Sequence, residues 1–98
     1  MTIYEVNIDI DAALATDYRA WLNEHVAEIL ALPGFTAAEV FVVEDAPPGR
    51  VAYCIQYRLD SRAALDAYLR EHAPRLRAEG VARWGDRFSA RRRIMQRS

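Results

Sequence analysis

The chain begins with a segment in which apolar and polar side chains alternate. Within residues 3–10, one face carries Tyr4, Val6, Ile8 and Ile10. A period of two among β-branched residues is typical of a strand that is buried on one side. Over residues 12–32 the apolar positions recur at helical spacing instead, and Pro33 and Gly34 end that pattern. We therefore expect a strand and then a helix, with Asp11 as the N-cap of the helix.

Three further strands follow from the same reading. Residues 35–44 have two apolar faces, and residues 51–59 alternate again. The segment between them, 46–49, reads Ala-Pro-Pro-Gly, which is typical of a loop, so the second of these strands is expected to return antiparallel to the first. Residues 87–95 predict the last strand, whose inner face would carry Phe88, Ala90, Arg92 and Ile94.

The segment after the third strand predicts a second, interrupted helix. Its apolar stripe consists of Leu65, Tyr68, Leu69, His72 and Leu76. Asp60 or Ser61 is expected to cap its start. Pro74 lacks a backbone donor and disfavours helical geometry in the preceding residue, so it predicts a kink or a restart near Ala73. We expect Gly80 to end the helix.

A short repeat relates the two halves of the chain. Residues 20–25 and residues 67–72 match at four of six positions, and an aromatic ring is kept at a fifth. A strand-like run precedes and follows each copy, so the chain reads as two βαβ halves. With right-handed crossovers and one hairpin, this predicts a single ferredoxin-like α+β domain over residues 1–98. Its order would be βαββαβ, with an antiparallel sheet of strand order 4-1-3-2 and both helices on one face.

Composition and charge exclude several classes of protein. Of the 98 residues, 52% are hydrophobic and 28% are charged, which is the ordinary globular range. The formal net charge of −1 argues against a nucleic-acid or membrane-surface protein, and no apolar run approaches the roughly 18 residues of a membrane span. Neither a phosphate loop nor a dinucleotide fingerprint is present, so no cofactor is expected. The single Cys54 and a start without a signal-peptide pattern favour the cytoplasm.

One face of the predicted sheet has no helix to cover it. This face would combine apolar and charged side chains, namely Phe41 or Val42, Glu5, Arg91 and Arg93. The charges can pair across neighbouring strands. A mixed surface of this kind suits a sheet that packs against a second sheet, and a homodimer formed through this face is therefore expected.

Several segments resemble, in order and spacing, those of a known group of proteins. They are Tyr18–His25, Gly34-Phe35, Gln56-Tyr57 and Tyr68–Arg77. On these segments the chain resembles the uncharacterised short bacterial proteins of the dimeric α+β barrel superfamily. That superfamily includes cofactor-independent monooxygenases of antibiotic biosynthesis, muconolactone isomerases and stress-responsive barrel proteins. The resemblance implies the ferredoxin-like fold and a dimeric barrel. Its link to the enzymes is architectural, and a shared fold does not establish a shared function.

Two histidines, His25 and His72, occupy matched positions on the apolar stripes of the two helices. Imidazole titrates near neutral pH, so each is a candidate general acid or base. Each can equally be a packed side chain whose ring nitrogens bond to tyrosine hydroxyls or to the backbone, and the sequence does not decide between these roles. A shared metal ion is not expected, because no third histidine, cysteine or well-spaced carboxylate completes a site.

Large aromatic side chains are expected to gather on the helix side of the sheet. Tyr53 and Tyr57 are two positions apart on one strand, so both would point towards the helices, where they meet Tyr18, Trp21 and Tyr68. Such a group forms either a core or an apolar pocket with hydroxyl groups, and all five are candidate site residues. A core role is favoured for Trp21 and Tyr53. Tyr57 lies nearer the strand end and is the candidate catalytic tyrosine.

Arg77 follows the predicted kink and could clamp a carboxylate or a phosphate.

We therefore interpret the chain as a dimeric protein that binds or transforms a small anionic or aromatic molecule between helices and sheet without a cofactor. His25 and His72 would be acid–base groups, and Tyr57 and Arg77 would orient the ligand. The alternative is a non-catalytic binding or assembly dimer. The free volume beneath the helices distinguishes the two, because an enzyme needs space that aromatic side chains do not fill.

Overall fold

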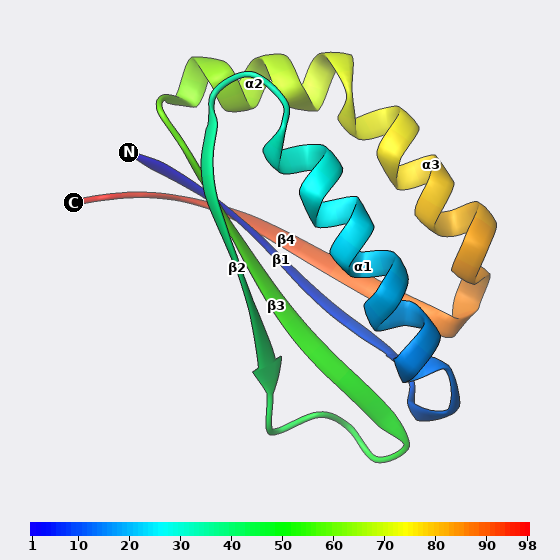
Figure 1. The fold of residues 1–98 in the computed structure, drawn as a ribbon. Coiled ribbons are helices and arrows are strands. Elements are labelled where there is room, and N and C mark those ends of the chain that lie inside the picture. The colour runs from blue at the N-terminus through cyan, green and yellow to red at the C-terminus, as the bar shows by residue number, and fades with distance from the viewer.

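The order of elements in the computed structural model, which describes residues 1–98, is the one that the sequence predicts. The elements are β1 (Thr2–Asp11), α1 (Ala15–Leu30), β2 (Phe35–Val43), β3 (Arg50–Leu59), α2 (Arg62–Glu71), α3 (Ala73–Trp84) and β4 (Phe88–Gln96) (Figure 1). The strands form one antiparallel sheet with the order β2-β3-β1-β4. This confirms the predicted ferredoxin-like α+β fold with the strand order 4-1-3-2.

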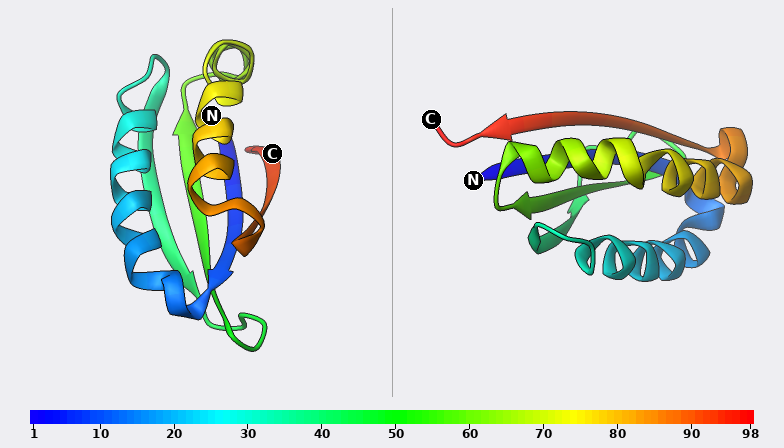
Figure 2. Two further views of the ribbon diagram at one scale, coloured as in Figure 1. Left: turned by 90° about the vertical axis from the view of Figure 1, so that its right-hand side faces the viewer. Right: turned by 90° about the horizontal axis from the view of Figure 1, so that it is seen from above.

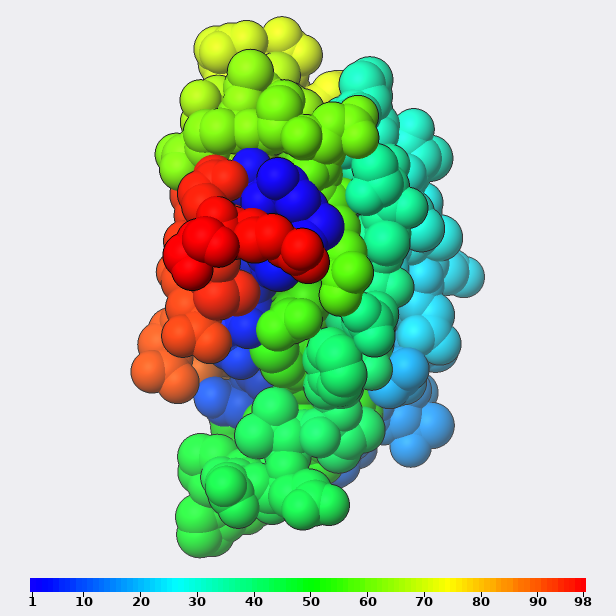
Figure 3. Space-filling view, turned by 90° about the vertical axis from the view of Figure 1, so that its left-hand side faces the viewer, coloured from blue at the N-terminus to red at the C-terminus, as the bar shows by residue number.

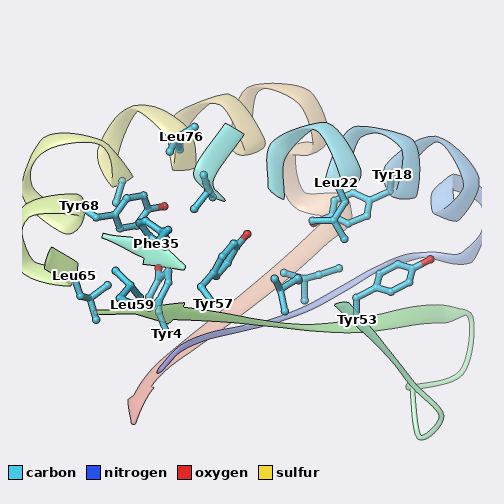
Figure 4. Close-up of a cluster of buried hydrophobic side chains, with 14 of the residues drawn as sticks. Tyr4, Tyr18, Leu22, Phe35, Tyr53, Tyr57, Leu59, Leu65, Tyr68 and Leu76 are labelled. Carbon is cyan, nitrogen blue, oxygen red and sulfur yellow. The ribbon is translucent and has the colours of Figure 1, made fainter. Parts of the chain in front are cut away.

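All three helices lie on the same face of the sheet (Figures 1 and 2). α1 and α3 run side by side in opposite directions, and α2 lies at one end of the helical layer. The core fills the space between this layer and the two central strands, where Tyr4 of β1 pairs in register with Tyr57 of β3 (Figure 4). None of the helices is both long and apolar enough to cross a membrane.

The register of β2 shows which of its two apolar faces is covered. Phe41 lies opposite Cys54, whose side chain points away from the helices, and Val42 lies opposite the inward-facing Tyr53. Phe41 is therefore the apolar residue of the uncovered face, where it is 44% exposed. The sequence left Phe41 and Val42 as alternatives because β2 is apolar on both sides and its pairing shifts between Phe35 and Ala37.

Figure 3 shows the molecule from the side of the sheet that no helix covers. A buried carboxylate, that of Glu5, links the strands on this face. Glu5 is only 2% exposed although no helix covers it. Its oxygens accept hydrogen bonds from the Asn7 amide and the Gln56 amide, both at 2.9 Å, and from the Arg93 guanidinium. These donors, with that of Arg93 first, lower the pKa of Glu5 to about 2. The expected ion pairing across strands is thus present between β1 and β4.

The second helix is interrupted as predicted, but it ends later than predicted. Ser61 is the N-cap of α2, because its hydroxyl accepts a hydrogen bond from the Ala64 N–H at 3.1 Å. The chain leaves helical geometry at His72 and resumes as α3 with Pro74 in its first turn. The expected end at Gly80 is wrong, because α3 continues to Trp84. Gly80 lies on the buried side of α3 near Trp21 and Phe88, and this packed environment keeps it helical despite its low helix propensity.

The expected role of Asp11 as a helix N-cap is also wrong. A short 3-10 turn, Ala12–Leu14, separates it from α1, and its side chain makes no capping bond. The Asp11 carboxylate instead pairs with the Arg50 guanidinium at 2.6 Å, and Arg50 also binds Asp9. The Asp11 side chain, which was expected to cap the helix, thus forms an ion pair with the adjacent strand instead.

Candidate functional site

A small cavity lies between the helical layer and the sheet. It measures about 50 Å³, and 12 of its 16 lining residues are hydrophobic. The polar groups come from every part of the fold, with His25 on α1, Arg77 on α3, Arg92 on β4 and tyrosines on both helices and sheet. Of the residues that the sequence singled out, this cavity brings together Tyr18, Trp21, His25, Tyr57, Tyr68 and Arg77.

Three tyrosine hydroxyls of the cavity have no hydrogen-bond partner in the protein. Tyr18 and Tyr57 are each 2% exposed and Tyr68 is 5% exposed, but their hydroxyl oxygens are not fully enclosed; the Trp84 indole nitrogen is the fully buried side-chain atom that lacks a partner. Figure 4 shows the three rings directed into the space between helices and sheet. Burial raises the pKa of all three, that of Tyr68 to about 12. Each hydroxyl is therefore protonated at neutral pH and can donate a hydrogen bond.

His25 is held in the cavity wall by stacking. Its ring lies on the indole of Trp21, one helical turn earlier, with centroids 4.6 Å apart and an angle of 16° between the planes. Burial lowers the pKa of His25 below its usual value of 6.5, so the ring is neutral at pH 7. No protein group bonds to either ring nitrogen. The imidazole can therefore donate a proton through one nitrogen and accept one through the other.

His72 does not reach this cavity. It lines a different hollow of about 120 Å³, formed with Pro33, Gly34, Glu71 and other residues at the junction of α2 and α3. The repeat placed the two histidines at equivalent points of two helices, but α2 ends at Glu71, and His72 has a φ of −124°. Because of this break, the His72 side chain does not have the direction that the His25 side chain has in the continuous helix α1.

Tyr53 also lies outside the cavity. Its ring is buried and stacks on that of Tyr18 with centroids 6.3 Å apart. Figure 4 shows it directed towards the end of the sheet that is distant from Tyr68. Tyr53 thus belongs to the core, the role that the sequence favoured for it, while Tyr57 two positions later lines the cavity.

Arg77 is fixed at the edge of the cavity by a hydrogen bond. Its guanidinium donates to the hydroxyl of Tyr4 at 3.0 Å, which joins α3 to β1. A second link joins α3 to α1, because Arg75 pairs with Glu28 at 3.2 Å and with Glu79 at 3.1 Å. Arg75 does not line the cavity. These contacts hold α3 down over the space that the tyrosines enclose.

Two polar residues of the cavity were not among the candidates from the sequence. Tyr4 enters it from β1, and Arg92 enters it from β4, where it lies opposite Val6. A signal for both was present, because strand alternation placed each of them on the inner face. Neither Tyr4 nor Arg92 was named as a candidate site residue, although both were expected on the inner faces of their strands.

The cavity contains no group that could hold a metal ion. No cluster of three or more histidine, cysteine, aspartate or glutamate side chains occurs anywhere in the protein, and no carboxylate lines the cavity. Cys54 lies on the opposite face of the sheet, and burial raises the pKa of its thiol. The polar groups that line the cavity are therefore tyrosine hydroxyls, a neutral imidazole and two guanidinium groups.

The fold is shared with solved structures over almost the whole chain. A protein from Deinococcus radiodurans, described as a candidate antibiotic biosynthesis monooxygenase, is 14% identical with a TM-score of 0.78, covering 100% of this chain and 93% of that one. SnoaB, a cofactor-independent oxygenase from Streptomyces nogalater, is 11% identical with a TM-score of 0.73, covering 99% and 93% of the two chains. An ethyl tert-butyl ether d family protein from Bacillus halodurans is 15% identical with a TM-score of 0.66, covering 100% of both.

At these identities the likeness establishes the fold alone, which is the ferredoxin-like α+β fold. This is the fold that the resemblance of the sequence segments implies. No curated protein matches the sequence. The chain belongs to the family described as Domain of unknown function (DUF4286), whose model matches residues 1–98.

Proposed function

We propose that this protein binds a small molecule in the cavity beneath α1 and α3. The observation that carries the proposal is a set of three hydroxyls, on Tyr18, Tyr57 and Tyr68, that line the cavity and lack a partner in the protein. Polar groups that face a largely enclosed cavity are hydrogen-bonded there to water or to a bound molecule. A bound molecule is the partner that these groups are arranged to meet. SnoaB supports the proposal as a cofactor-independent oxygenase built on the same fold.

His25 is the acid–base group of the proposed site. It is neutral at pH 7 and both its ring nitrogens are free, so it can take a proton from a bound molecule or return one. The Tyr57 hydroxyl lines the same cavity and can donate a hydrogen bond to the bound molecule. The reaction would need no cofactor, since the proton is exchanged between ligand and imidazole. His72 is not part of this site because it faces another hollow.

The proposal includes a homodimer formed through the uncovered face of the sheet. Phe41 is 44% exposed there, beside the Glu5 network, and a second copy would remove this ring from water. Light scattering should give twice the mass of one chain, and Phe41→Lys should give a monomer. Val42→Lys is the matched control, because Val42 is exposed but faces the other side of the sheet. A cytoplasmic location is part of the same proposal and rests on the single, unpaired Cys54.

The volume of the cavity supports a second candidate function, a non-catalytic assembly dimer. About 50 Å³ holds only a few water molecules, whereas ligand pockets commonly measure about 300–1,000 Å³. A larger ligand would require α3 to move and the bonds Arg77–Tyr4 and Arg75–Glu28 to break. On this alternative the hydroxyls bind ordered water, and the dimer itself is the functional unit.

A thermal-shift screen separates the two candidates. Small anionic and aromatic molecules are tested on the unmodified protein, on Tyr57→Phe and on Tyr53→Phe. Each variant loses one hydroxyl from a buried ring of β3, but only Tyr57 lines the cavity. A site in the cavity predicts a ligand-induced rise in the melting temperature that Tyr57→Phe abolishes and Tyr53→Phe retains. If no compound stabilises the protein, the assembly function is the one that remains.

A further inference from the structure

The cavity has two arginines and no carboxylate. Arg77 reaches it from α3 and Arg92 from β4, and no aspartate or glutamate lines it. Neither arginine takes part in an ion pair of the protein, although eight such pairs are formed elsewhere. The only hydrogen bond between either guanidinium and the protein is from Arg77 to the neutral hydroxyl of Tyr4. The positive charge at the site is thus not neutralised by the chain.

Position distinguishes Arg92 from the other arginines that lack an ion pair. Arg91, its neighbour, lies opposite Asn7, so its side chain is on the uncovered face of the sheet. Arg92 lies opposite Val6 and shares the helix-facing side with the cavity. Its charge partly opposes the effect of burial on the pKa of Tyr18, Tyr57 and Tyr68. Arg92 therefore lines the same cavity as the three hydroxyls.

The hydrogen-bonding groups around the cavity are mainly donors. The two guanidinium groups can only donate, and each protonated hydroxyl carries a hydrogen that no protein acceptor uses. The remaining wall is apolar, with Leu22, Ile29 and Ile55 among its side chains. A molecule that matches this surface carries a negatively charged acceptor at one end and a small apolar body at the other.

We propose that the cavity binds a small organic carboxylate, with its two oxygens held by Arg92 and by the tyrosine hydroxyls and its apolar body against Leu22 and Ile29. This deepens, and rests on, the proposed small-molecule function. A guanidinium matches a carboxylate in geometry, since both are planar and two parallel bonds can form. Free phosphate fits less well, because the apolar wall offers nothing to its remaining oxygens. The cavity volume limits the body to a few carbon atoms.

The test compares isobutyrate with isobutyramide, which have nearly the same shape and differ in charge. Binding is followed by NMR through the two indole N–H signals, at constant ionic strength. Trp21 lines the cavity and should report binding, whereas Trp84 packs against Trp21 without lining the cavity, so its signal should shift less. We expect isobutyrate to shift the Trp21 signal saturably and isobutyramide to bind at least about tenfold more weakly, because a charge-assisted bond is lost.

Two variants assign the effect to one arginine. Arg92→Gln should weaken isobutyrate binding about tenfold or more, and Arg91→Gln should leave it within about twofold, although each removes one positive charge from β4. Both side chains are exposed, so both variants are expected to fold, which their thermal unfolding checks. Equal weakening by the two variants would overturn the assignment of the anion site to Arg92.

The remaining outcomes separate this inference from the function on which it rests. If isobutyrate and isobutyramide bind equally, the cavity takes small molecules but does not select a carboxylate, and only the inference fails. If inorganic phosphate displaces isobutyrate at equal concentration, the site is a general anion site and the inference fails as well. If neither compound, nor benzoate, nor phenol shifts the Trp21 signal, the small-molecule function fails together with the inference.

Discussion

The imidazole of His25 lies flat on the indole of Trp21, with ring centroids 4.6 Å apart. Stacking fixes the orientation of the imidazole and leaves both ring nitrogens free. A hydrogen bond to a neighbouring tyrosine would also fix the ring, but it would occupy one of the nitrogens. The ring is thus positioned and still free to exchange a proton. A histidine that only filled the core would be expected to have its N–H bonded within the protein. This relationship gives the cavity its one group that can change charge near neutral pH.

Acidification should destabilise the protein through His25. Burial lowers the pKa of His25 below 6.5, so between the folded and unfolded pKa values the unfolded chain binds more protons. This contribution to stability is complete above about pH 6.5 and is lost as the pH falls through the folded-state pKa. Chemical denaturation at several pH values should show a smaller loss for His25→Phe than for the unmodified protein. An NMR titration midpoint of His25 at or above 6.5 would contradict the prediction.

Glu5 should stabilise the sheet until strongly acidic pH. Its pKa is lowered from 4.5 to about 2, so its contribution is present above pH 4.5 and lost as the pH falls through about 2. Glu5→Gln keeps the shape but removes the charge, and should lower the unfolding free energy at pH 7 by about 1.5–3 kcal/mol. Glu39→Gln is the control, because Glu39 is 53% exposed and its pair with Arg58 should contribute less than about 1 kcal/mol. Equal effects would show that the Glu5 network adds nothing beyond a surface pair.

Gly34 should tolerate no side chain. It has a φ of +86°, and a Cβ built on it would lie 2.5 Å from the Cβ of Ala64, at the start of α2. Gly34→Ala should therefore combine backbone strain with overpacking and cost about 2–5 kcal/mol. Gly49→Ala shares the strain, with a φ of +76°, but meets nothing within 4 Å, and should cost about 1–2 kcal/mol. The difference between the two denaturant midpoints measures the close approach of the α1–β2 loop to α2.

The two tryptophans should differ in their contribution to stability. Trp84, at the end of α3, is 4% exposed and packs edge-on against Tyr18, so Trp84→Ala should cost about 3–5 kcal/mol. Trp21 is half-buried and partly faces the cavity, so Trp21→Ala should cost about 1.5–3 kcal/mol. The Trp84 indole N–H is buried without a partner, and Trp84→Phe removes it. That variant should therefore be closer to the unmodified protein than Trp84→Ala. A larger cost at Trp21 than at Trp84 would contradict this.

Alternation and helical spacing were sufficient to predict the fold. Every strand and the strand order follow from the positions of apolar residues and from short connections, and the helix break follows from Pro74. The two errors concern the helix ends. Asp11 pairs with Arg50 instead of capping α1, and the burial of Gly80 keeps α3 helical at a residue type that usually ends a helix. Neither effect can be seen before the elements are packed together.

The candidate site was predicted less completely than the fold. The sequence named His25, Tyr57 and Arg77 as candidate site residues, and all three line the cavity. It could not separate His72 from His25, because equivalent positions in a repeat remain equivalent only while both helices stay straight. Strand alternation placed Arg92 on the inner face of its strand, but it gave no reason to name Arg92 as a site residue. Its significance appears only once the lack of any carboxylate beside it is known.

The position of β1 has a consequence for how the fold is completed. β1 lies between β3 and β4 in the sheet and pairs with both. Without β4, one edge of β1 would have unpaired backbone groups, and Glu5 would lack the guanidinium of Arg93. The cavity would also lack Arg92. The pairing of β4 with β1 therefore completes the sheet, the Glu5 network and the cavity wall in a single step.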